Sequence, residues 1–594
     1  RMGWVGDAQM SAEAAAYNFD MAQFYSKFEG DIRESQLETG SVAGVSPAYW
    51  SCYPADPTYA TACVEFPWVV SRYYDDDRIV EESLETMTKW VDYLGSQEDE
   101  DGIVSFGLFG DWCPPMHANP VDTPFEITST WYYCHDALMV SRMAARIGKA
   151  DVAKKYRHFL NVGKTERECI TQIVKEAEEA GYVSLEEKVK KGEALKAGDK
   201  VYTVGMKKII ALYHIGEDDL AEGMNILCAH IDSPRLDIKQ NPLYEDTDLA
   251  YLDTHYYGGV KKYQWVALPM AMHGVIVKKD GTVVNVTIGE DEEDPVLYIT
   301  DLLIHLAGQQ MAKKASEAVE GEKLDILIGS QPLKDLPDDK KKEAVKENVL
   351  RILNKKYGVE EEDFLSAELE IVPAGKARDC GLDRSMIAGY GQDDRVCAYT
   401  SLLALLEMEA PKRTSCCLLV DKEEIGSVGA TGMQSRFFEN SVAELLDGMG
   451  CYSELALRRA LRNSSMLSSD VSAGYDPAYG EAFEKKNAAY LGRGIVLNKF
   501  TGARGKSGSN DANAEYVARV RRIFDDHNVA FQTAELGKVD FGGGGTIAYI
   551  AALYGMEVID SGVAVLSMHA PWEVTSKADV YEAYKAYKAF LLDA

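Results

Sequence analysis

Five widely separated residues between positions 230 and 569 are of the kinds that bind paired divalent metal ions. Each lies in a short stretch that is typical of a strand end followed by a turn. Two histidines and three carboxylates suit two ions that share one bridging carboxylate, and such a pair of ions indicates metal-assisted hydrolysis. The five are His230 in AHIDSP, Asp393 in GQDDR, Glu424 in DKEEIGS, Asp470 in LSSD and His569 in SMHAP.

Two acidic neighbours of these residues have predicted catalytic roles. Asp232 stands two residues after His230 and can accept the ring N–H that does not face a metal, which fixes the tautomer. Glu423 and Glu424 are adjacent at a strand end, so their carboxylates can point in different directions. We expect Glu424 to bind metal, and Glu423 to take a proton from the attacking water and pass it to the leaving amine.

Each of these signals has an alternative interpretation. A histidine in a His-x-Asp pair is more often structural than a ligand, and a glutamate pair often forms a solvated acidic turn. Asp393 is the expected bridging carboxylate, and Asp394 beside it is the competing candidate. In open α/β sheets ligands gather outside the carboxyl ends of the strands, which is where this interpretation places all five residues.

Length and composition limit the class of protein. The chain has 594 residues and a formal charge of -32, so we expect two or more domains and a surface that disfavours nucleic acid. Basic runs alternate with glutamates and indicate solvated helix faces. The eleven cysteines show no CxxC spacing, which favours reduced thiols and a cytoplasmic location. No apolar run is long enough for a membrane span.

The pattern of the chain changes along its length. Residues 1–156 are rich in Trp and Tyr and contain amphipathic helical stretches, so we expect an all-α part. Residues 157–237 and 386–594 alternate short β-branched runs with helices, which predicts an α/β catalytic domain. Residues 238–385 interrupt it as an inserted lobe, with a hairpin in GVIVKKDGTVVNVTIG and a charged helix near its end.

The order of AHIDSP, GQDDR, DKEEIGS, SSD and SMHAPWE resembles the M18 family of zinc aminopeptidases, the aspartyl aminopeptidase and aminopeptidase I group, over residues 157–594. The resemblance implies a zinc-peptidase fold that removes N-terminal residues from peptides. It implies two zinc ions per subunit, for which cobalt or manganese can substitute. It also implies that Glu423 is the base and that Glu424 and His569 complete the pair begun by His230, Asp393 and Asp470; the residues themselves leave the partition between the two ions open.

The same resemblance implies that the inserted lobe forms dimers, that dimers assemble into a twelve-subunit shell, and that a histidine of the lobe reaches a neighbour's active site. The matching position is His305 in DLLIHLAG, a stretch with a helical pattern. Its alternative interpretation is a histidine on an apolar helix face. The segment NKFTGARGKSGS departs from the family pattern, although Lys499, Arg504 or Lys506 in it could meet a substrate carboxylate. A non-catalytic, metal-bound assembly subunit is a further alternative.

The first 156 residues resemble part of the catalytic (α/α)6 barrel of GH78 α-L-rhamnosidases, through RMGWVGDAQ, ADPTYATACVEFPWVV and GLFGDW. The resemblance makes Asp7 and Trp112 sugar-pocket residues. Inverting hydrolysis needs a carboxylate on each side of the bond, and neither partner has a counterpart here, so we expect an inactive remnant. Part of a barrel leaves apolar helix faces unpaired. Two truncated parts that meet without a linker suggest an artificial or misassembled fusion.

Overall fold

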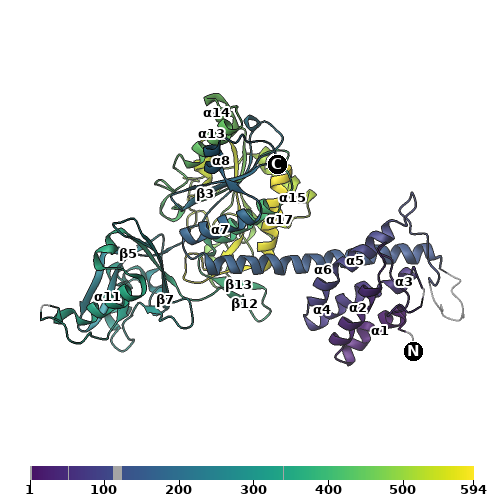
Figure 1. Ribbon diagram of the computed structural model, residues 1–594, viewed down its shortest axis with the longest axis horizontal. Helices are drawn as coiled ribbons and strands as arrows, with labels where there is room; N and C mark the ends of the chain where they lie inside the picture. Colours follow the sequence, from purple (N-terminus) through teal and green to yellow (C-terminus); the bar gives the residue numbers. More distant parts are fainter. Residues whose placement is uncertain (1–2, 51, 111–122, 339, 503) are drawn as a thin grey trace. The chain divides into compact units, whose positions relative to one another are not determined.

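The computed structural model divides into two compact units, Arg1–Asp151 and Val152–Ala594, drawn in Figure 1. We describe each unit by itself. The sequence-based boundaries at 156, 237 and 385 remain predictions. The structure describes residues 3–50, 52–110, 123–338, 340–502 and 504–594.

The first unit is built from helices, which confirms the all-α prediction for this part of the chain. α4 is its central element, because α1, α2 and α5 all pack against it. Aromatic side chains fill the contacts, and Tyr25 of α2 stacks on Phe66 of α4 with ring centroids 5.0 Å apart. The helices are α1 (Val5–Asn18), α2 (Ala22–Ser35), α3 (Pro57–Ala60), α4 (Ala62–Tyr74), α5 (Arg78–Gly95) and α6 (Phe125–Val162), which continues into the second unit.

Several large apolar side chains of this unit remain exposed. Met10 is 76% exposed and Leu108 is 75% exposed, and Trp131 on α6 is more than half exposed. Isolated exposed apolar residues are common, but this unit presents many of them on several helices.

One buried carboxylate gives this unit a testable pH dependence. Glu29 of α2 is fully buried, and burial raises its pKa well above 4.5 although Arg33 and Ser83 oppose the shift. Unfolding releases the carboxyl to water, where it ionises, so the stability of this unit falls as pH rises above about 4.5 toward the raised pKa.

We therefore expect Glu29→Gln to stabilise the unit at pH 8 by about 1–3 kcal/mol and to have little effect at pH 5. Thermal unfolding followed by tryptophan fluorescence checks this, because six of the eight tryptophans lie before residue 152. Glu34→Gln, an exposed position on the same helix, is the matched control. An equal gain at both pH values would contradict the role of ionisation.

In the described part of the chain, the second unit contains three sheets of nine, seven and five strands. The largest sheet has the order β1-β2-β3-β14-β4-β15-β19-β17-β18. Its inner strands read as continuous apolar runs because both of their faces are covered. The strands are β1 (Val183–Ser184), β2 (Lys200–Gly205), β3 (Ile209–His214), β4 (Asn225–His230), β14 (Ser415–Val420), β15 (Ser465–Ser468), β17 (Ile495–Asn498), β18 (Phe531–Thr533) and β19 (Glu557–Gly562).

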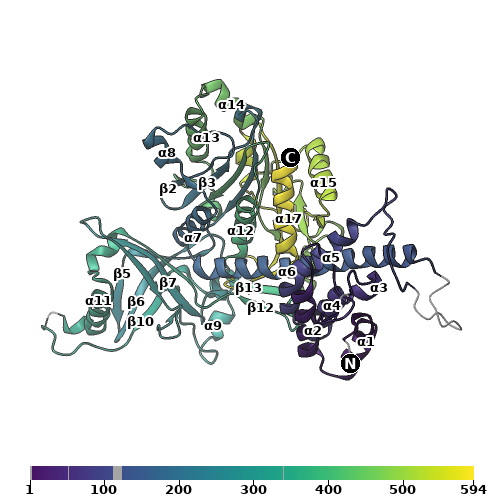
Figure 2. The same ribbon diagram turned by 45° about the vertical axis from the view of Figure 1, so that its right-hand side comes forward.

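Two helical layers cover this sheet. Leu227 and Ala229 of β4 point into one core, with the helices α12 and α17, and Ile226 and Cys228 point into the other. α12 packs on both α17 and β4, and Figure 2 shows α12 and α17 alongside each other. The period of two along the strand therefore divides its residues between the layers. The helices are α7 (Glu166–Glu179), α8 (Leu185–Lys191), α12 (Gln392–Leu406), α13 (Phe437–Gly448), α14 (Glu454–Arg462), α15 (Ala514–Asp526), α16 (Ala548–Ala552) and α17 (Lys577–Asp593).

The seven-stranded sheet closes on itself and forms a lobe, which we call the barrel lobe. Its order is β11-β5-β6-β10-β9-β7-β8, and an additional β11–β7 pairing closes a six-strand barrel with β8 attached. The predicted hairpin is confirmed as β7 and β8, and the predicted charged helix as α11 (Ala344–Tyr357). The strands are β5 (Arg235–Asp246), β6 (Leu249–Tyr257), β7 (Pro269–Val277), β8 (Val283–Ile288), β9 (Leu297–Tyr298), β10 (Ile326–Gly329) and β11 (Ala367–Pro373).

The smallest sheet, of order β12-β13-β21-β20-β16, is mostly antiparallel. Gln392, the first residue of α12, connects this helix to the sheet. Its side chain donates hydrogen bonds to the carbonyls of Ile387 in β13 and Glu573 in β21. The sheet thus ties the start of α12 to the C-terminal segment. The strands are β12 (Arg378–Cys380), β13 (Met386–Gly389), β16 (Ser472–Ala473), β20 (Ala564–Leu566) and β21 (Glu573–Ser576).

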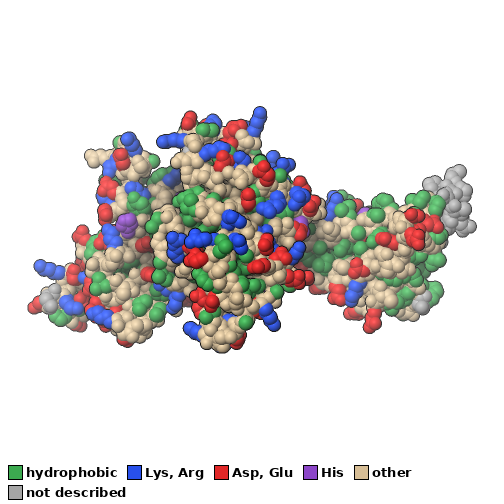
Figure 3. Space-filling model, turned by 90° about the horizontal axis from the view of Figure 1, so that it is seen from above, with side chains coloured by type: hydrophobic (Ala, Val, Ile, Leu, Met, Phe, Trp, Pro, Cys, Tyr) green, Lys and Arg blue, Asp and Glu red, His purple; other side chains and the backbone are tan. Residues whose placement is uncertain are grey.

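The helices, the buried cysteines and the surface charges bear on the expectations drawn from composition. Among the described residues no helix is both long and apolar enough to span a membrane. Cys416 and Cys417 are buried on opposite faces of β14 as free thiols. On the face drawn in Figure 3, lysines and arginines alternate with aspartates and glutamates.

Candidate metal centre

Three neighbouring parallel strands bring four of the predicted site residues to one edge of the central sheet. β14 and β15 each pair in parallel with β4, on its two sides. His230 is the last residue of β4, Glu423 and Glu424 follow β14, and Asp470 follows β15. The carboxyl ends of parallel strands meet at the same edge, so these side chains gather there.

The other two predicted ligands also follow strands, but these strands belong to the five-stranded sheet and not to the central one. The expectation that all five lie outside the strand ends of one open sheet is therefore wrong for these two. Asp393 follows β13 and lies in the first turn of α12. His569 follows β20 in a turn, with a φ of 65°. The local sequence predicts a strand followed by a turn in each case. It does not show which sheet the strand joins, because that depends on hydrogen bonds to distant strands.

The five side chains meet around the carboxylate of Asp393. One of its oxygens, Oδ1, lies 3.2 Å from His230 Nε2, and Oδ2 lies 3.2 Å from His569 Nε2. Asp470 Oδ1 lies 3.9 Å from His230 Nε2, and Glu424 Oε2 lies 3.6 Å from His569 Nε2. The ligand atoms thus fall into two adjacent sets, His230 with Asp394 and Asp470, and Asp393 with Glu424 and His569, and Asp393 also lies next to His230 of the first set.

Both imidazoles are held by acceptors on their other nitrogen. His230 Nδ1 lies 3.0 Å from the carbonyl oxygen of Asp232 and 3.2 Å from its Oδ1. His569 Nδ1 lies 2.9 Å from the carbonyl oxygen of Gly259. An N–H at Nδ1 leaves the Nε2 lone pair free to bind metal, so these partners assign the same tautomer to both rings.

Asp232 also shapes the turn that carries the two glutamates. Its Oδ1 accepts the backbone N–H of Glu423 at 3.1 Å, and its Oδ2 accepts that of Glu424 at 3.2 Å. The hydroxyl of Tyr257 donates to Oδ2 at 2.8 Å. One buried carboxylate therefore orients both a histidine and the adjacent acidic pair.

The electrostatics of the cluster favour bound cations. Burial and then Asp394 raise the pKa of Asp470, and burial and then Asp393 raise the pKa of Glu424. Burial, partly offset by His230, raises the pKa of Glu423 to about 7. So many buried carboxylates repel one another unless positive charge lies between them, and divalent ions would supply it. Glu424 also has a buried oxygen, Oε1, without a hydrogen-bond partner.

Asp394 was the competing candidate for the bridging carboxylate. Asp394 lies close to His230 and Asp470, and its Oδ2 accepts the backbone N–H of His230 at 3.4 Å. It does not lie between the two histidines, and Asp393 does. Asp393 is thus the better placed of the two for a bridge.

Glu573 had no predicted role. Its Oε1 accepts the N–H of His569 at 2.7 Å and its Oε2 accepts the N–H of Asp393 at 3.1 Å, and burial raises its pKa to about 8. Its place in SMHAPWE, four residues after His569, was the available signal.

The remaining predicted residues lie outside this cluster. His305 is exposed in a turn, and the helix α9 (Gly308–Met311) begins only after it, so the helical prediction for this stretch is wrong. An apolar segment without a packing partner does not hold a short helix. Lys499 is exposed with its Nζ 3.0 Å from Asp511 Oδ1, and Arg504 is exposed in a nearby turn. Their substrate-binding roles remain predictions.

The two predicted sugar-pocket residues belong to the first unit. Asp7 lies on α1 and lines a cavity of about 880 Å³ together with Trp4, Tyr59 and Tyr132. Trp112 lies outside the described residues.

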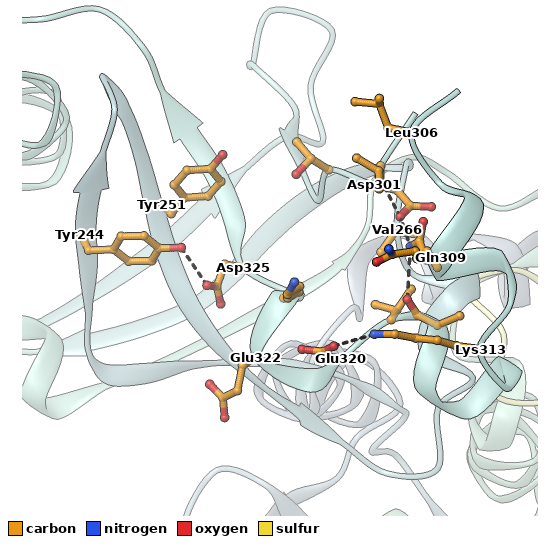
Figure 4. A pocket seen from close by; sticks show the side chains of 16 residues that line it. Tyr244, Tyr251, Val266, Asp301, Leu306, Gln309, Lys313, Glu320, Glu322 and Asp325 are labelled. Carbon is orange, nitrogen blue, oxygen red and sulfur yellow. Dashed lines mark hydrogen bonds and ion pairs between the residues drawn. The ribbon is translucent and has the colours of Figure 1, made fainter. Parts of the chain in front are cut away.

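A separate cavity of about 650 Å³ opens in the barrel lobe, and its lining contains none of the five predicted ligands. In Figure 4 the hydroxyl of Tyr244 points to Asp325, and Lys313 reaches Glu320. Leu306, from the turn that holds His305, also lines it.

Comparison with known proteins identifies the larger part of the chain. Residues 159–591 match the model of the aminopeptidase I zinc metalloprotease family, M18. The chain belongs to the M18 family. The probable M18 family aminopeptidase 1 of Clostridium acetobutylicum is 63% identical over 437 residues, which cover 74% of this chain and 93% of that protein. The M18 aminopeptidase structure from Thermotoga maritima is 46% identical, with a TM-score of 0.72 over 75% of this chain and 97% of that one.

Two further similarities concern the fold of a dodecameric protein and the first part of the chain. The mApe1 dodecamer of S. cerevisiae shares the fold of this M18 chain, with a TM-score of 0.60 at 21% identity over 74% of this chain and 96% of that one. Residues 1–165 match the bacterial alpha-L-rhamnosidase 6 hairpin glycosidase domain. The M18 chain therefore carries a segment similar to a glycosidase domain ahead of a zinc aminopeptidase.

Proposed function

We propose that this M18 chain is a di-zinc aminopeptidase that hydrolyses the N-terminal peptide bond of peptides. The observation that carries the proposal is the position of Asp393, with one carboxylate oxygen 3.2 Å from the Nε2 of each histidine. A single carboxylate between two imidazoles suits a pair of ions about 3.5–4 Å apart. His230 and Asp470 would hold one ion, Glu424 and His569 the other, and Asp393 both.

Zinc bound there supplies a Lewis acid for the substrate carbonyl and lowers the pKa of water. Glu423 is the proposed base: its Oε2 lies 4.0 Å from His230 Nε2, at the rim of the ligand set. It takes a proton from the attacking water and returns it to the leaving amino group. A carboxylate beside the attacking water can perform both transfers, first as the acceptor of the proton and then as its donor. Asp232 keeps this base in place through the N–H of Glu423.

We further propose that the chain forms homo-oligomers through the barrel lobe, dimers assembling to a dodecamer. The support is an exposed apolar segment around His305, in which Leu303, Ile304 and Leu306 are all more than half exposed. Exposed apolar segments of this length mark protein interfaces. The mApe1 dodecamer of S. cerevisiae, which has the same fold, provides a precedent for the assembly.

A panel of aminoacyl arylamides, assayed on the full chain, tests the proposed activity. We expect cleavage that a chelator abolishes and that added zinc, cobalt or manganese restores. The reason is that the proposed mechanism needs bound cations to polarise the substrate carbonyl and to activate water. The panel also identifies the preferred N-terminal residue, and acidic substrates test Lys499 and Arg504.

Two results would contradict the proposal. Arylamide cleavage that persists after exhaustive chelation would exclude a metal-dependent mechanism. Intact oligomers that bind zinc without cleaving any substrate would instead indicate an assembly subunit. An aryl rhamnoside serves as the control substrate, and its release independent of chelator would point to the first unit.

A further inference from the structure

One short segment of the barrel lobe contacts the surroundings of both candidate metal sites. β6 ends at Tyr257, and Gly258 and Gly259 follow it. All three residues lie against the catalytic part of the second unit, although the barrel lobe contributes none of the five proposed ligands. We call residues 257–259 the YGG segment.

The first residue of the segment acts on the His230 side. The Tyr257 hydroxyl donates to Asp232 Oδ2, and the same carboxylate contacts His230 Nδ1 through its Oδ1. Asp232 is completely buried, so its oxygens depend on protein donors for compensation of their charge. Loss of the tyrosine hydroxyl would leave one of these donors missing and would loosen the orientation of His230.

The tyrosine is itself anchored by the barrel. The guanidinium of Arg235 lies 3.8 Å from the centroid of the Tyr257 ring, and it pairs with Glu166 and Glu370. Arg235 is also the register partner of Tyr257 across β5 and β6. The ring therefore has a fixed position that does not depend on its hydroxyl.

The last residue of the segment acts on the His569 side. The carbonyl oxygen of Gly259 is 2.9 Å from His569 Nδ1. A Cβ at position 259 would lie 3.3 Å from the same nitrogen, closer than most side chains tolerate. The absence of a side chain thus lets the backbone approach the imidazole.

The middle residue has the same requirement. Gly258 has a φ of 78°, and a Cβ there would lie 3.2 Å from Glu424 Oε2. Glycine adopts this conformation without strain and leaves room for the carboxylate.

We infer that the YGG segment is a positioning element through which the barrel lobe orients the ligands of both metal sites, Tyr257 acting through Asp232 on His230 and Gly259 acting directly on His569. The inference rests on the proposed di-zinc function. Groups that orient metal-binding histidines commonly change metal affinity by about 10- to 100-fold when they are removed.

Zinc affinity of the full chain, measured by competition with a chromogenic chelator, tests the inference. We expect Tyr257→Phe to weaken at least one of two bound zinc equivalents by about 10- to 100-fold, and Gly259→Ala to weaken the one beside His569. The double variant should weaken both equivalents, because the two residues act on different histidines. The absorption bands of the cobalt-substituted protein should change in each single variant.

Matched controls separate positioning from folding. Tyr256→Phe removes the hydroxyl of the exposed neighbour, and Gly30→Ala adds a methyl on α2 whose nearest neighbouring atom lies 3.9 Å away. Both should bind two zinc ions with unchanged affinity. The melting temperature of each metal-free variant reports on stability alone.

The outcomes distinguish the inference from the function on which it rests. Wild-type protein that binds fewer than two zinc ions would contradict the proposed function. Wild-type protein that binds two, with Tyr257→Phe and Gly259→Ala binding both as tightly, would overturn the inference. A lower melting temperature with unchanged zinc affinity would assign the segment a purely structural role and would also overturn it.

Discussion

Replacement of Glu423 by Gln is expected to lower kcat by about 10²- to 10⁴-fold while the protein still binds two zinc ions per subunit. The amide keeps the size of the side chain and its backbone hydrogen bond to Asp232, but it cannot accept a proton from water. Glu423 lies outside the two closest ligand sets, which contain His230 and His569, so metal content should be unaffected.

Turnover of aminoacyl arylamides and zinc content by elemental analysis measure the two effects on one preparation. Glu444→Gln, an exposed glutamate on α13, is the matched control and should behave as wild type. Retained turnover in Glu423→Gln would refute the base assignment. A joint loss of zinc and turnover would make Glu423 a ligand.

Replacement of Asp393 by Asn is expected to disturb both ions, because the carboxylate contacts both histidines. A neutral amide oxygen can face only one side as an acceptor, and it carries no charge to balance two cations. We expect zinc content to fall below one per subunit at zinc concentrations that saturate the wild type. Activity should fall to the level that remains after chelation.

Two comparisons make this result decisive. Asp470→Asn should lose one ion, because of the two histidines it is His230 that Asp470 lies near. Asp394→Asn should retain more zinc than Asp393→Asn if Asp393 is the bridge. The reverse order would transfer the bridging role to Asp394. Asp447→Asn, exposed on α13, controls for the substitution itself.

Much of the candidate centre was predictable because its residues stand in recognisable local contexts. The apolar run before His230 predicts a buried strand, and the strand β4 ends at that residue. The run before Glu423 likewise predicts β14. A polar residue that closes a buried strand lies at the carboxyl edge of the sheet, where ligands gather, so its chemistry can be inferred from the chain alone.

The prediction for His305 failed for a related reason. Apolar residues in DLLIHLAG fit a helical pattern, but the structure has an exposed turn at this position. Periodicity predicts a helix only where another surface buries its apolar face, and the described residues of the second unit leave Leu303, Ile304 and Leu306 exposed. Local pattern cannot distinguish an apolar segment that packs within the chain from one that is left on the surface.

The amino-acid sequence by itself determined the family, the α/β class and the kinds of side chain that could bind metal, since these depend on residue type and on patterns a few residues long. Only the tertiary structure decided that Asp393 rather than Asp394 lies between the histidines, that Tyr257 donates to Asp232, and that Gly259 and Glu573 contact His569. These relations join segments up to 310 residues apart. Hydrogen bonds of this kind depend on distances below about 3.5 Å between atoms that only the packed chain brings together.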